Sequence, residues 1–429
     1  MYLSVGRFQF PRTGIRLVIS VLNYKPHDVY KKCPKDTFYS GSLDTFATMQ
    51  ADLQLPYLPT DPLEQGGMLV YLSAFLIQMI YFWIVFRKLA FYKKAPEEGS
   101  GEAVSVVISA RNEYFNLKHN LPLILQQDYP DFEVVVVNDN SQDDSLELLE
   151  DMARENNKIK IVNLSQDLNF FRGKKFPLSL GIKSATYDII LLTDADCRPA
   201  SDSWIRNMAS RFSGDKEIVL GYGGYEHRWG LMNLVIRYEA LWVAIQYLSF
   251  ALSGKTYMGV GRNMAYRKSL FYKHKGFVSH YTVSSGDDDL FINTVATTRN
   301  VAIEIGAESA TFSHPKTSFK DWWVQKRRHL TTWKYYRRRF KWLLGMWSVS
   351  QLLFFALFVV LLAAGFNIMT VLGVFLLRIV SYLLITKLSM NRLHEKKLLL
   401  FSPIAEVFLM LFYPLVSMVN MVSKPDRWK

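Results

Sequence analysis

Residues 189–196, IILLTDAD, run from four aliphatic residues and a threonine directly into two carboxylates. Three earlier stretches are also rich in β-branched residues, and they lie at 104–109 (VSVVIS), 133–138 (EVVVVN) and 159–164 (IKIVNL). Such runs are typical of strands buried on both faces, and the helix-like stretches between them predict right-handed βαβ crossovers. The sequence therefore predicts a parallel, Rossmann-like α/β sheet.

Polar residues follow three of the four predicted strands, at the edge where ligands bind in open parallel sheets. Residues 110–113 (ARNE) follow the first strand, Asp139 follows the second, and Asp194 and Asp196 follow the fourth. A turn or a helix N-cap would explain any one of them. Three such groups at equivalent strand ends favour a single ligand site.

The chain has no GxxxxGK[ST] or GxGxxG loop, so ATPase and dehydrogenase functions lack their usual phosphate cradle. The sequence Asp194-Ala195-Asp196 offers another means of neutralising a diphosphate. Its carboxylates can hold Mg²⁺ or Mn²⁺ while phosphate oxygens complete the coordination. The chain has only two cysteines, Cys33 and Cys197, which excludes a disulfide framework and a zinc site made from sulfur alone.

Four apolar segments are long enough to cross a hydrocarbon core of ~30 Å. They lie at 67–90, 342–366, 369–385 and 398–422, so 342–422 forms a C-terminal membrane region of three helices. Pro403, Glu406 and Pro414 predict a broken or re-entrant last helix. By the positive-inside rule, the region after the first segment is cytoplasmic, because that segment ends in a basic cluster: Arg87, Lys88, Lys93 and Lys94. We expect an integral protein of the inner or plasma membrane, with an N-terminal extension, 1–66, to which no function is assigned.

Basic and aromatic residues are interleaved over residues 319–341, FKDWWVQKRRHLTTWKYYRRRFK, directly before a membrane segment. Together with a net charge of +13, this composition also occurs in proteins that bind single-stranded nucleic acid. Beside a bilayer, we interpret it as an interfacial amphipathic helix with Trp322, Trp323 and Trp333 at the headgroup level. Residues 337–339, all arginine, would face anionic lipid. We therefore expect contact with membrane lipid and no nucleic-acid partner.

From Val104 to about Trp333 the chain resembles the processive-synthase-like branch of glycosyltransferase family 2. The resemblance rests on an ordered set of motifs: SARNE (109–113), VNDNSQD (137–143), RGK (172–174), TDAD (193–196), GVGRN (259–263), SGDDDL (285–290) and QKRRH (325–329). Two positions depart from the family pattern, since Ala110 stands where proline is more frequent and His329 replaces a tryptophan. The resemblance implies an α/β GT-A (Rossmann-like) cytoplasmic domain over 101–318, flanked by transmembrane α-helices.

The resemblance also implies roles for the residues of these motifs. Asp288 would be the general base, and Asp196 with Asp194 would hold the metal. Nucleotide binding is implied for Ala110, Asn112, Glu113, Asp139, Lys174 and Asp194. Contact with the diphosphate or the acceptor is implied for Gln325, Arg328, His329, Gly261, Asn263 and Asp287. One base and an in-line attack imply inversion at the anomeric carbon, unlike the two-carboxylate scheme of retaining hydrolases.

The resulting hypothesis is an inverting membrane transferase that uses Mg²⁺ or Mn²⁺. It would move a sugar from a nucleotide-diphosphate donor, expected to be a UDP-sugar, to a lipid-linked or saccharide acceptor in cell-surface glycan synthesis. Four spans and His329 favour single transfer, or a polymerase that depends on an export or synthase partner protein. A processive polysaccharide synthase stays an alternative. A catalytically inert scaffold that binds nucleotide sugars is the alternative from another class, and the charged residues Asp139, Asp288 and Arg328 argue against it.

Overall fold

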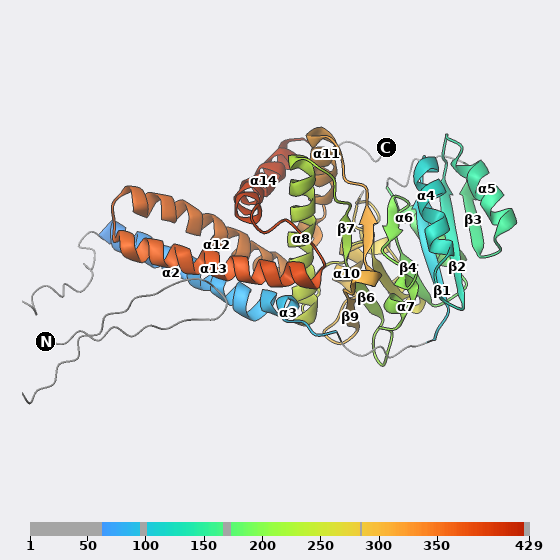
Figure 1. The fold of residues 1–429 in the computed structure, drawn as a ribbon, viewed down its shortest axis with the longest axis horizontal. Coiled ribbons are helices and arrows are strands. Elements are labelled where there is room, and N and C mark those ends of the chain that lie inside the picture. Colours follow the sequence, from blue (N-terminus) through green and yellow to red (C-terminus); the bar gives the residue numbers. More distant parts are fainter. Residues whose placement is uncertain (1–61, 95–100, 166–172, 284, 424–429) are drawn as a thin grey trace, which may run out of the picture. The chain divides into compact units, whose positions relative to one another are not determined.

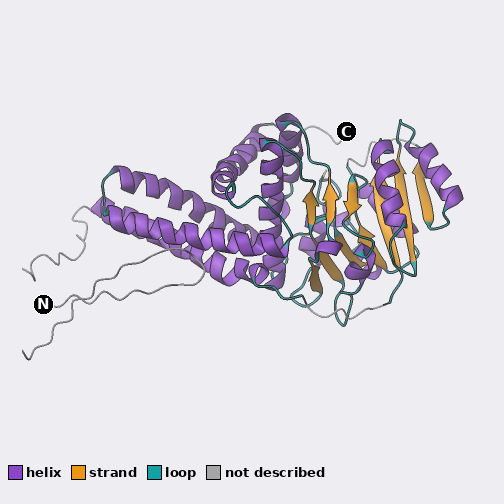
Figure 2. Cartoon of the chain, in the orientation of Figure 1, coloured by secondary structure: helices purple, strands orange, loops and turns teal. Residues whose placement is uncertain are grey.

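The computed structural model describes residues 62–94, 101–165, 173–283 and 285–423. Most of the extension predicted over 1–66 lies outside these described residues, as does Arg172 of the RGK motif. The first described helix begins at Pro62, so residues 62–66 belong to it and not to the extension. Long helices and a strand-rich region are distinct parts of the described chain (Figure 2).

A seven-stranded sheet forms the centre of the strand-rich region, in the order β3-β2-β1-β4-β8-β6-β9. Its strands are β1 (Val104–Ala110), β2 (Phe132–Asp139), β3 (Ile159–Leu164), β4 (Ile189–Leu192), β6 (Ile218–Gly221), β8 (Met264–Arg267) and β9 (Val301–Glu304). The four predicted strands are all present and pair in parallel. The other three were missed, because β8 (MAYR) and β9 (VAIE) have no unbroken aliphatic run of the kind seen in β4 (IILL), and the run in β6 (IVLG) stops after three residues. β8 runs antiparallel to both of its neighbours, so the sheet is mixed and not fully parallel.

A second sheet of three short strands continues from the carboxyl end of β4, in the order β5-β10-β7. Its strands are β5 (Cys197–Pro199), β7 (Gly223–Tyr225) and β10 (Thr311–Ser313). β10 pairs antiparallel with β5 and parallel with β7. Because β5 begins directly after Asp196, this small sheet holds the backbone that carries the two predicted metal ligands.

Helices cover both faces of the larger sheet. They are α4 (Tyr114–Leu125), α5 (Ser145–Glu155), α6 (Lys175–Ser184), α7 (Trp204–Ala209), α8 (Leu231–Leu252), α9 (Lys268–Lys273) and α10 (Asp289–Val295), with short 3-10 turns η2 (Val278–His280) and η3 (Ala307–Ser309). Val106 and Ile108 of β1 join the core beneath α4 and α7, whereas Val107 joins the core that contains α6 and α8. Burial on both faces explains the aliphatic runs in the sequence.

α8 connects this sheet to the membrane segments. On the sheet side, the Tyr247 hydroxyl donates to the carbonyl oxygen of Gly221 in β6 at 2.6 Å. On the other side, Tyr238 hydrogen-bonds to Tyr382 at 2.8 Å, and the ring of Trp242 lies 5.7 Å from that of Trp347. One continuous hydrophobic core therefore runs from the sheet into the membrane helices.

Within the described part of the chain, four helical segments are long and apolar enough to cross a membrane, as the sequence predicts. The first consists of α2 (Pro62–Ile80), the π-helical turn η1 (Tyr81–Phe86) and α3 (Arg87–Ala90), and the others are α12 (Arg338–Ala363), α13 (Ile368–Arg392) and α14 (Ser402–Val422). We call these four segments the membrane helices. α2, α12 and α13 lie side by side (Figure 1).

The prediction of a broken or re-entrant last helix is wrong. α14 is one continuous helix that includes Pro414. Pro403 occupies its first turn, where the missing backbone N–H costs nothing. Glu406 is buried in the membrane region but has partners on other helices, so its charge does not force a break.

Residues 319–341 also differ from the prediction, since they do not form one helix. α11 (Phe319–His329) ends before a 3-10 turn, η4 (Trp333–Tyr335), and α12 begins only at Arg338. Trp322 was expected among the lipid headgroups but is fully buried, with its ring stacked 4.5 Å from that of Phe412 in α14. α11 therefore presents its aromatic face to another helix of the protein.

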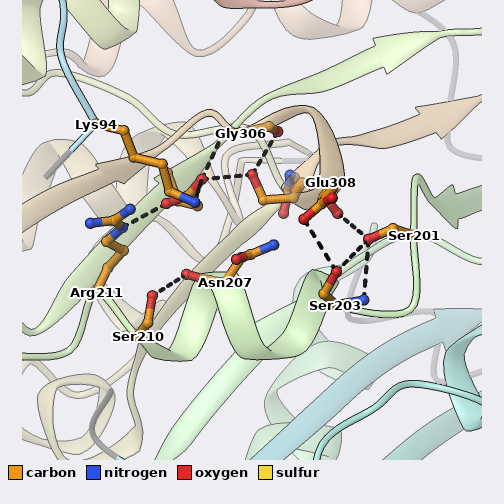
Figure 3. A network of polar contacts seen from close by, with 11 residues as sticks. Lys94, Ser201, Ser203, Asn207, Ser210, Arg211, Gly306 and Glu308 are labelled. Carbon is orange, nitrogen blue, oxygen red and sulfur yellow. Dashed lines mark hydrogen bonds and ion pairs between the residues drawn. The ribbon is translucent and has the colours of Figure 1, made fainter. Parts of the chain in front are cut away.

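A polar network fastens the end of the first membrane segment to the edge of the sheet (Figure 3). At its centre, the buried Glu304 accepts a hydrogen bond from Arg211 at 2.6 Å and one from the Ser309 hydroxyl at 3.0 Å. Lys94, which follows α3, lies 3.9 Å from the same carboxylate. Two cations from distant parts of the chain thus share one buried anion.

A second buried network lies within the membrane helices. Arg378 of α13 is fully buried and pairs through two nitrogens with Glu406 of α14. Its third nitrogen donates to Gln78 of α2 at 2.9 Å, and Gln351 of α12 donates to Glu406 at 2.9 Å. All four membrane helices contribute one group. A charge in this setting is tolerated only when it is paired and hydrogen-bonded.

Replacing Arg378 by leucine should destabilise the protein by about 3–5 kcal/mol, because the Glu406 carboxylate is left buried without its cation. The double variant Arg378→Leu/Glu406→Leu should recover most of that loss, since no charge then stays unpaired. Arg392→Leu at the exposed end of α13 is the control and should have little effect. Denaturant unfolding in micelles measures the difference. Equal instability of the single and double variants would contradict this account.

Candidate active site

A cavity of about 1400 Å³ opens at the carboxyl ends of β1, β2 and β4 and continues between α8, α12 and α14. The parallel register places the ends of the three strands on one edge of the sheet. Most residues predicted for the site line this cavity: Glu113, Asp139, Lys174, Asp194, Asp196, Gly261, Asp287, Asp288, Gln325, Arg328 and His329. Ala110, Asn112 and Asn263 do not.

Two of the three predicted residues that do not line the cavity, Ala110 and Asn112, lie at the end of β1 and just after it. Ala110 is buried at the end of the strand. Asn112 adopts a left-handed φ of 56°, and its side-chain oxygen accepts from the backbone N–H of Gln142 at 2.7 Å, which ties two loops together. The residue that faces the cavity between them is Arg111, which lies 3.9 Å from Asp139. Arg111 was missed, although its place within the SARNE motif marked it as a candidate.

Asp194 and Asp196 point into the cavity from the turn between β4 and β5. Lys174 pairs directly with Asp194, and although burial opposes ionisation, this lysine holds the pKa of Asp194 below its usual range. The Ser313 hydroxyl donates to Asp196 at 3.0 Å. Lys174 is the residue directly before α6. Its ion pair with Asp194 connects the RGK motif to the TDAD motif.

The same turn offers ligands for a cation. Oxygen atoms of Asp194 and Asp196 and the sulfur of Cys197 lie within 4.8 Å of one another. Burial, followed by the two nearby carboxylates, raises the pKa of Cys197, so this side chain is a neutral thiol and a poor ligand for a hard cation. The two carboxylates suit Mg²⁺ or Mn²⁺, with open positions for phosphate oxygens.

Asp288 also lines the cavity. Its carboxylate accepts from the backbone N–H of Gly261 at 2.9 Å and from that of Asp289 at 2.7 Å, and it caps α10. Burial, followed by the charges of Asp287 and Asp289, raises the pKa of Asp288 to about 8. Asp289 accepts hydrogen bonds from the hydroxyls of Thr332 and Tyr336. The three consecutive aspartates all line the cavity but have different hydrogen-bond partners.

Lys175 holds the loop that carries these aspartates, and sequence reasoning missed it. It is buried at the start of α6, and its amine donates to the carbonyl oxygens of His280, Val283 and Ser285 at 2.7, 2.9 and 2.8 Å. Burial lowers the pKa of Lys175 to about 8, an effect that the nearby aspartates oppose. No local pattern distinguishes this lysine from Lys174, because its three partners are more than a hundred residues away in the sequence.

In the GVGRN motif, the cavity residues are Val260, Gly261 and Arg262. Asn263 is fully buried behind them, where it accepts from the Trp204 indole and donates to the carbonyl oxygens of Tyr222 and Ser309. Its predicted contact with sugar or acceptor is wrong. The Arg262 guanidinium lies over the Tyr225 ring at 4.2 Å and close enough to Asp194 to affect its ionisation.

α11 contributes Gln325, Arg328 and His329 to the lining of the cavity. Burial lowers the pKa of Arg328, while Asp287 and Asp194 favour its charged form. The guanidinium is therefore close enough to interact with both the acidic pair and the aspartate loop.

The comparisons with known proteins agree with this arrangement. The profile described as Glycosyl transferase family 2 matches residues 105–275. A poly-β-1,6-N-acetyl-D-glucosamine synthase of Staphylococcus epidermidis is 31% identical over 136 residues, which are 29% of this chain and 32% of the synthase. A glycosyltransferase of Synechocystis sp. described as uncharacterized is 41% identical over 96 residues, 22% of this chain and 29% of that protein. The chain thus spans about a third of the length of these curated relatives.

One solved structure extends the likeness in fold beyond that region. It is a mannosyltransferase from Pyrobaculum calidifontis in complex with GDP-Man and Mn²⁺, with 19% identity and a TM-score of 0.52 over 80% of this chain and 98% of that one. At this identity the likeness concerns the fold alone. Residues 105–275 are thus similar to glycosyltransferase family 2, and the domain has the GT-A fold.

Proposed function

We propose that this chain is an inverting membrane glycosyltransferase that takes a sugar from a nucleotide-diphosphate donor, a UDP-sugar, and transfers it to an acceptor hydroxyl. The observation that carries the proposal is that Asp194 and Asp196 share one cavity with Asp288. Displacing a nucleotide diphosphate requires stabilisation of charge on the leaving group and removal of a proton from the attacking hydroxyl. An acidic metal site and a separate carboxylate meet these two needs.

The donor would bind along the edge formed by β1, β2 and β4. Asp139, beside Arg111, would contact the nucleotide base, and Lys174 and Arg328 would face the diphosphate as cations. Asp194 and Asp196 would hold Mg²⁺ or Mn²⁺, which supplies Lewis-acid stabilisation of the leaving diphosphate when bound. The bidentate Arg328 guanidinium would add hydrogen bonds to the same group.

Asp288 would remove the proton of the acceptor hydroxyl. A general base works best when its pKa is near the operating pH, and the raised pKa of Asp288 meets that condition. The backbone N–H groups of Gly261 and Asp289 hold its carboxylate in one orientation. A single base with direct displacement predicts inversion of the anomeric centre.

The acceptor would approach from the membrane, because the cavity continues from Asp288 to residues of α8, α12 and α14. A lipid-linked or saccharide acceptor in cell-surface glycan synthesis fits this position. His329 and the four membrane helices favour single transfer. The likeness to a poly-β-1,6-N-acetyl-D-glucosamine synthase keeps processive synthesis as the second candidate, with an export partner supplying what four helices lack.

The four membrane helices support anchoring in the inner or plasma membrane. Arg87 and Lys88 lie in the last turn of the first of them, and Lys93 and Lys94 lie between it and the GT-A domain. By the positive-inside rule, this cluster supports a cytoplasmic position for the domain, where nucleotide sugars are available.

Purified protein in nanodiscs should release nucleotide from one member of a panel of UDP- and GDP-sugars in the presence of Mn²⁺ or Mg²⁺. Asp288→Asn should lower kcat by ~10²–10⁴-fold, the usual contribution of a positioned base. Asp202 is an exposed carboxylate outside the cavity, so the control variant Asp202→Asn should behave as wild type. Tight nucleotide binding without release from any donor would instead support the inert scaffold.

Asp196→Asn should weaken Mn²⁺-dependent UDP binding by about tenfold or more, because a carboxylate ligand of the cation is lost. Isothermal calorimetry with and without a chelator measures this, and chelation should cost the wild type a similar factor. Asp202→Asn again serves as the control. If UDP bound equally well without metal, the assigned role of the acidic pair would be wrong.

The value of kcat/KM should rise with pH and level off near pH 8, because a base must be deprotonated and Asp288 has a pKa of about 8. Asp287→Asn should move this rise to lower pH, since the charge of Asp287 contributes to the raised pKa of Asp288. A pH profile of kcat/KM for both proteins makes the comparison. If the pH profile of the variant were the same as that of the wild type, the charge of Asp287 would not raise the pKa of Asp288, and this prediction would be wrong.

A further inference from the structure

Two consecutive lysines at the start of α6 contact different parts of the candidate site. Lys174, directly before the helix, pairs with Asp194 of the acidic pair. Lys175, the first residue of the helix, is 2% exposed and donates to three carbonyl oxygens of the segment 280–285. Neighbouring Cα atoms are only ~3.8 Å apart. The start of α6 therefore joins the two places where the proposed reaction needs carboxylates, the metal site and the loop of the base.

α6 is itself fixed against the sheet. Gly181 lies so close to β1 and β2 that an added Cβ would be 2.7 Å from side-chain atoms of both Val107 and Val137. Ile182 beside it is fully buried. Packing this dense leaves the helix no room to move toward the strands. Lys175 thus extends from a rigid element of the domain.

The segment that Lys175 contacts has little regular structure of its own. It follows the 3-10 turn η2 and leads to α10. Over the described part of 281–287, the one backbone–backbone hydrogen bond runs from the Val283 N–H to the His280 carbonyl oxygen at 3.1 Å. The Lys175 ammonium has three N–H groups, and this segment accepts from all three. Because burying an ammonium is costly unless hydrogen bonds compensate, the amine and the segment hold each other in one arrangement.

Lys175 acts from outside the cavity. It does not line the cavity, whereas Ser285 and Asp288 do. Ser285 contributes the last of the three carbonyl oxygens, and Asp288 follows it by three positions. Between them Gly286 has a left-handed φ of 100°, and an added Cβ there would be 2.6 Å from Leu290. The connection from the held carbonyl to the carboxylate is therefore short and sterically restricted.

We propose that Lys175 is a positioning residue for the proposed base: its three hydrogen bonds fix the segment 280–285 and thereby the place of Asp288 in the cavity. Lys174 acts on the metal site from the neighbouring position, so the start of α6 sets the distance between the leaving group and the base. A misplacement of ~1 Å can cost ~10²-fold in rate. The inference rests on the proposed transferase function, because it assigns a role within that site.

Lys175→Met tests the proposal, since it removes the three donors and keeps an unbranched side chain of similar length. It should lower kcat for nucleotide release by about 10–100-fold, the cost of a misplaced base, while the Kd for UDP stays unchanged. Hydrogen–deuterium exchange in nanodiscs should become faster in residues 280–288 and stay unchanged in β1 and β2. Lys183→Met alters an exposed lysine of the same helix and is the matched control, which should behave as wild type in each measurement.

Two further variants separate the hydrogen bonds from the position of the helix. Lys174→Met should raise the Kd for UDP, because a cation that faces the diphosphate is lost, and it should leave exchange in 280–288 as in the wild type. Lys175→Gln keeps two N–H donors at the buried position and should therefore lose less activity than Lys175→Met.

The proposal is overturned if Lys175→Met keeps the wild-type kcat, or if its kcat falls without faster exchange in 280–288. It is also overturned if Lys174→Met speeds exchange in that segment as much as Lys175→Met does, because the position of α6 would then hold the segment. Loss of UDP binding in both Lys175 variants would make this residue a requirement of the whole fold and would likewise overturn it. Wild-type protein that releases no nucleotide from any donor would instead count against the transferase function, and the exchange measurement would still show whether Lys175 orders the segment.

Discussion

The burial of α8 between the sheet and the membrane helices is the constraint on which the rest of the structure depends. Its buried Arg237 pairs with Glu395, which follows α13, and its buried Glu239 pairs with Lys326 of α11. Tyr413 of α14 donates to the same Glu239 at 2.8 Å. Each of these charges would be costly to bury without its partner. The partners therefore fix how α11, α13 and α14 stand against the domain, and α11 in turn brings Arg328 to the cavity.

Much of the fold could be predicted from the sequence because two signals were strong. β1, β2 and β4 are buried on both faces, which produces aliphatic runs, and the membrane helices are long and apolar. β6, β8 and β9 were not recognised, since none of them has an unbroken run of four aliphatic residues as β4 does. α8 has an apolar composition similar to that of a membrane helix, and only its packing shows that it belongs between the two regions.

Some residues of the candidate site could likewise be predicted from the sequence and others could not. Asp139, Asp194 and Asp196 could be predicted because residues at the ends of parallel strands meet at one edge. Asn263 lies in a motif whose neighbours face the cavity, but its own side chain points to Trp204 and into the core. Whether a motif residue faces the ligand or the interior depends on the local backbone direction. Arg262 and Lys175 were also missed. Their hydrogen-bond partners come from segments that are distant in the sequence, so no local pattern indicates where these side chains lie.

The hydrogen bonds from Thr332 and Tyr336 to Asp289 have a mechanical consequence. Both hydroxyls belong to the short connection between α11 and α12, so the loop that holds Asp288 is tied to the segment that leads directly into a membrane helix. Helices in bilayers change tilt when the thickness of the hydrocarbon layer changes. A tilt of α12 would move its first turn and, through Asp289, the neighbouring carboxylate. The lipid composition of the membrane would thereby tune the geometry of Asp288, the proposed base, without any lipid entering the cavity.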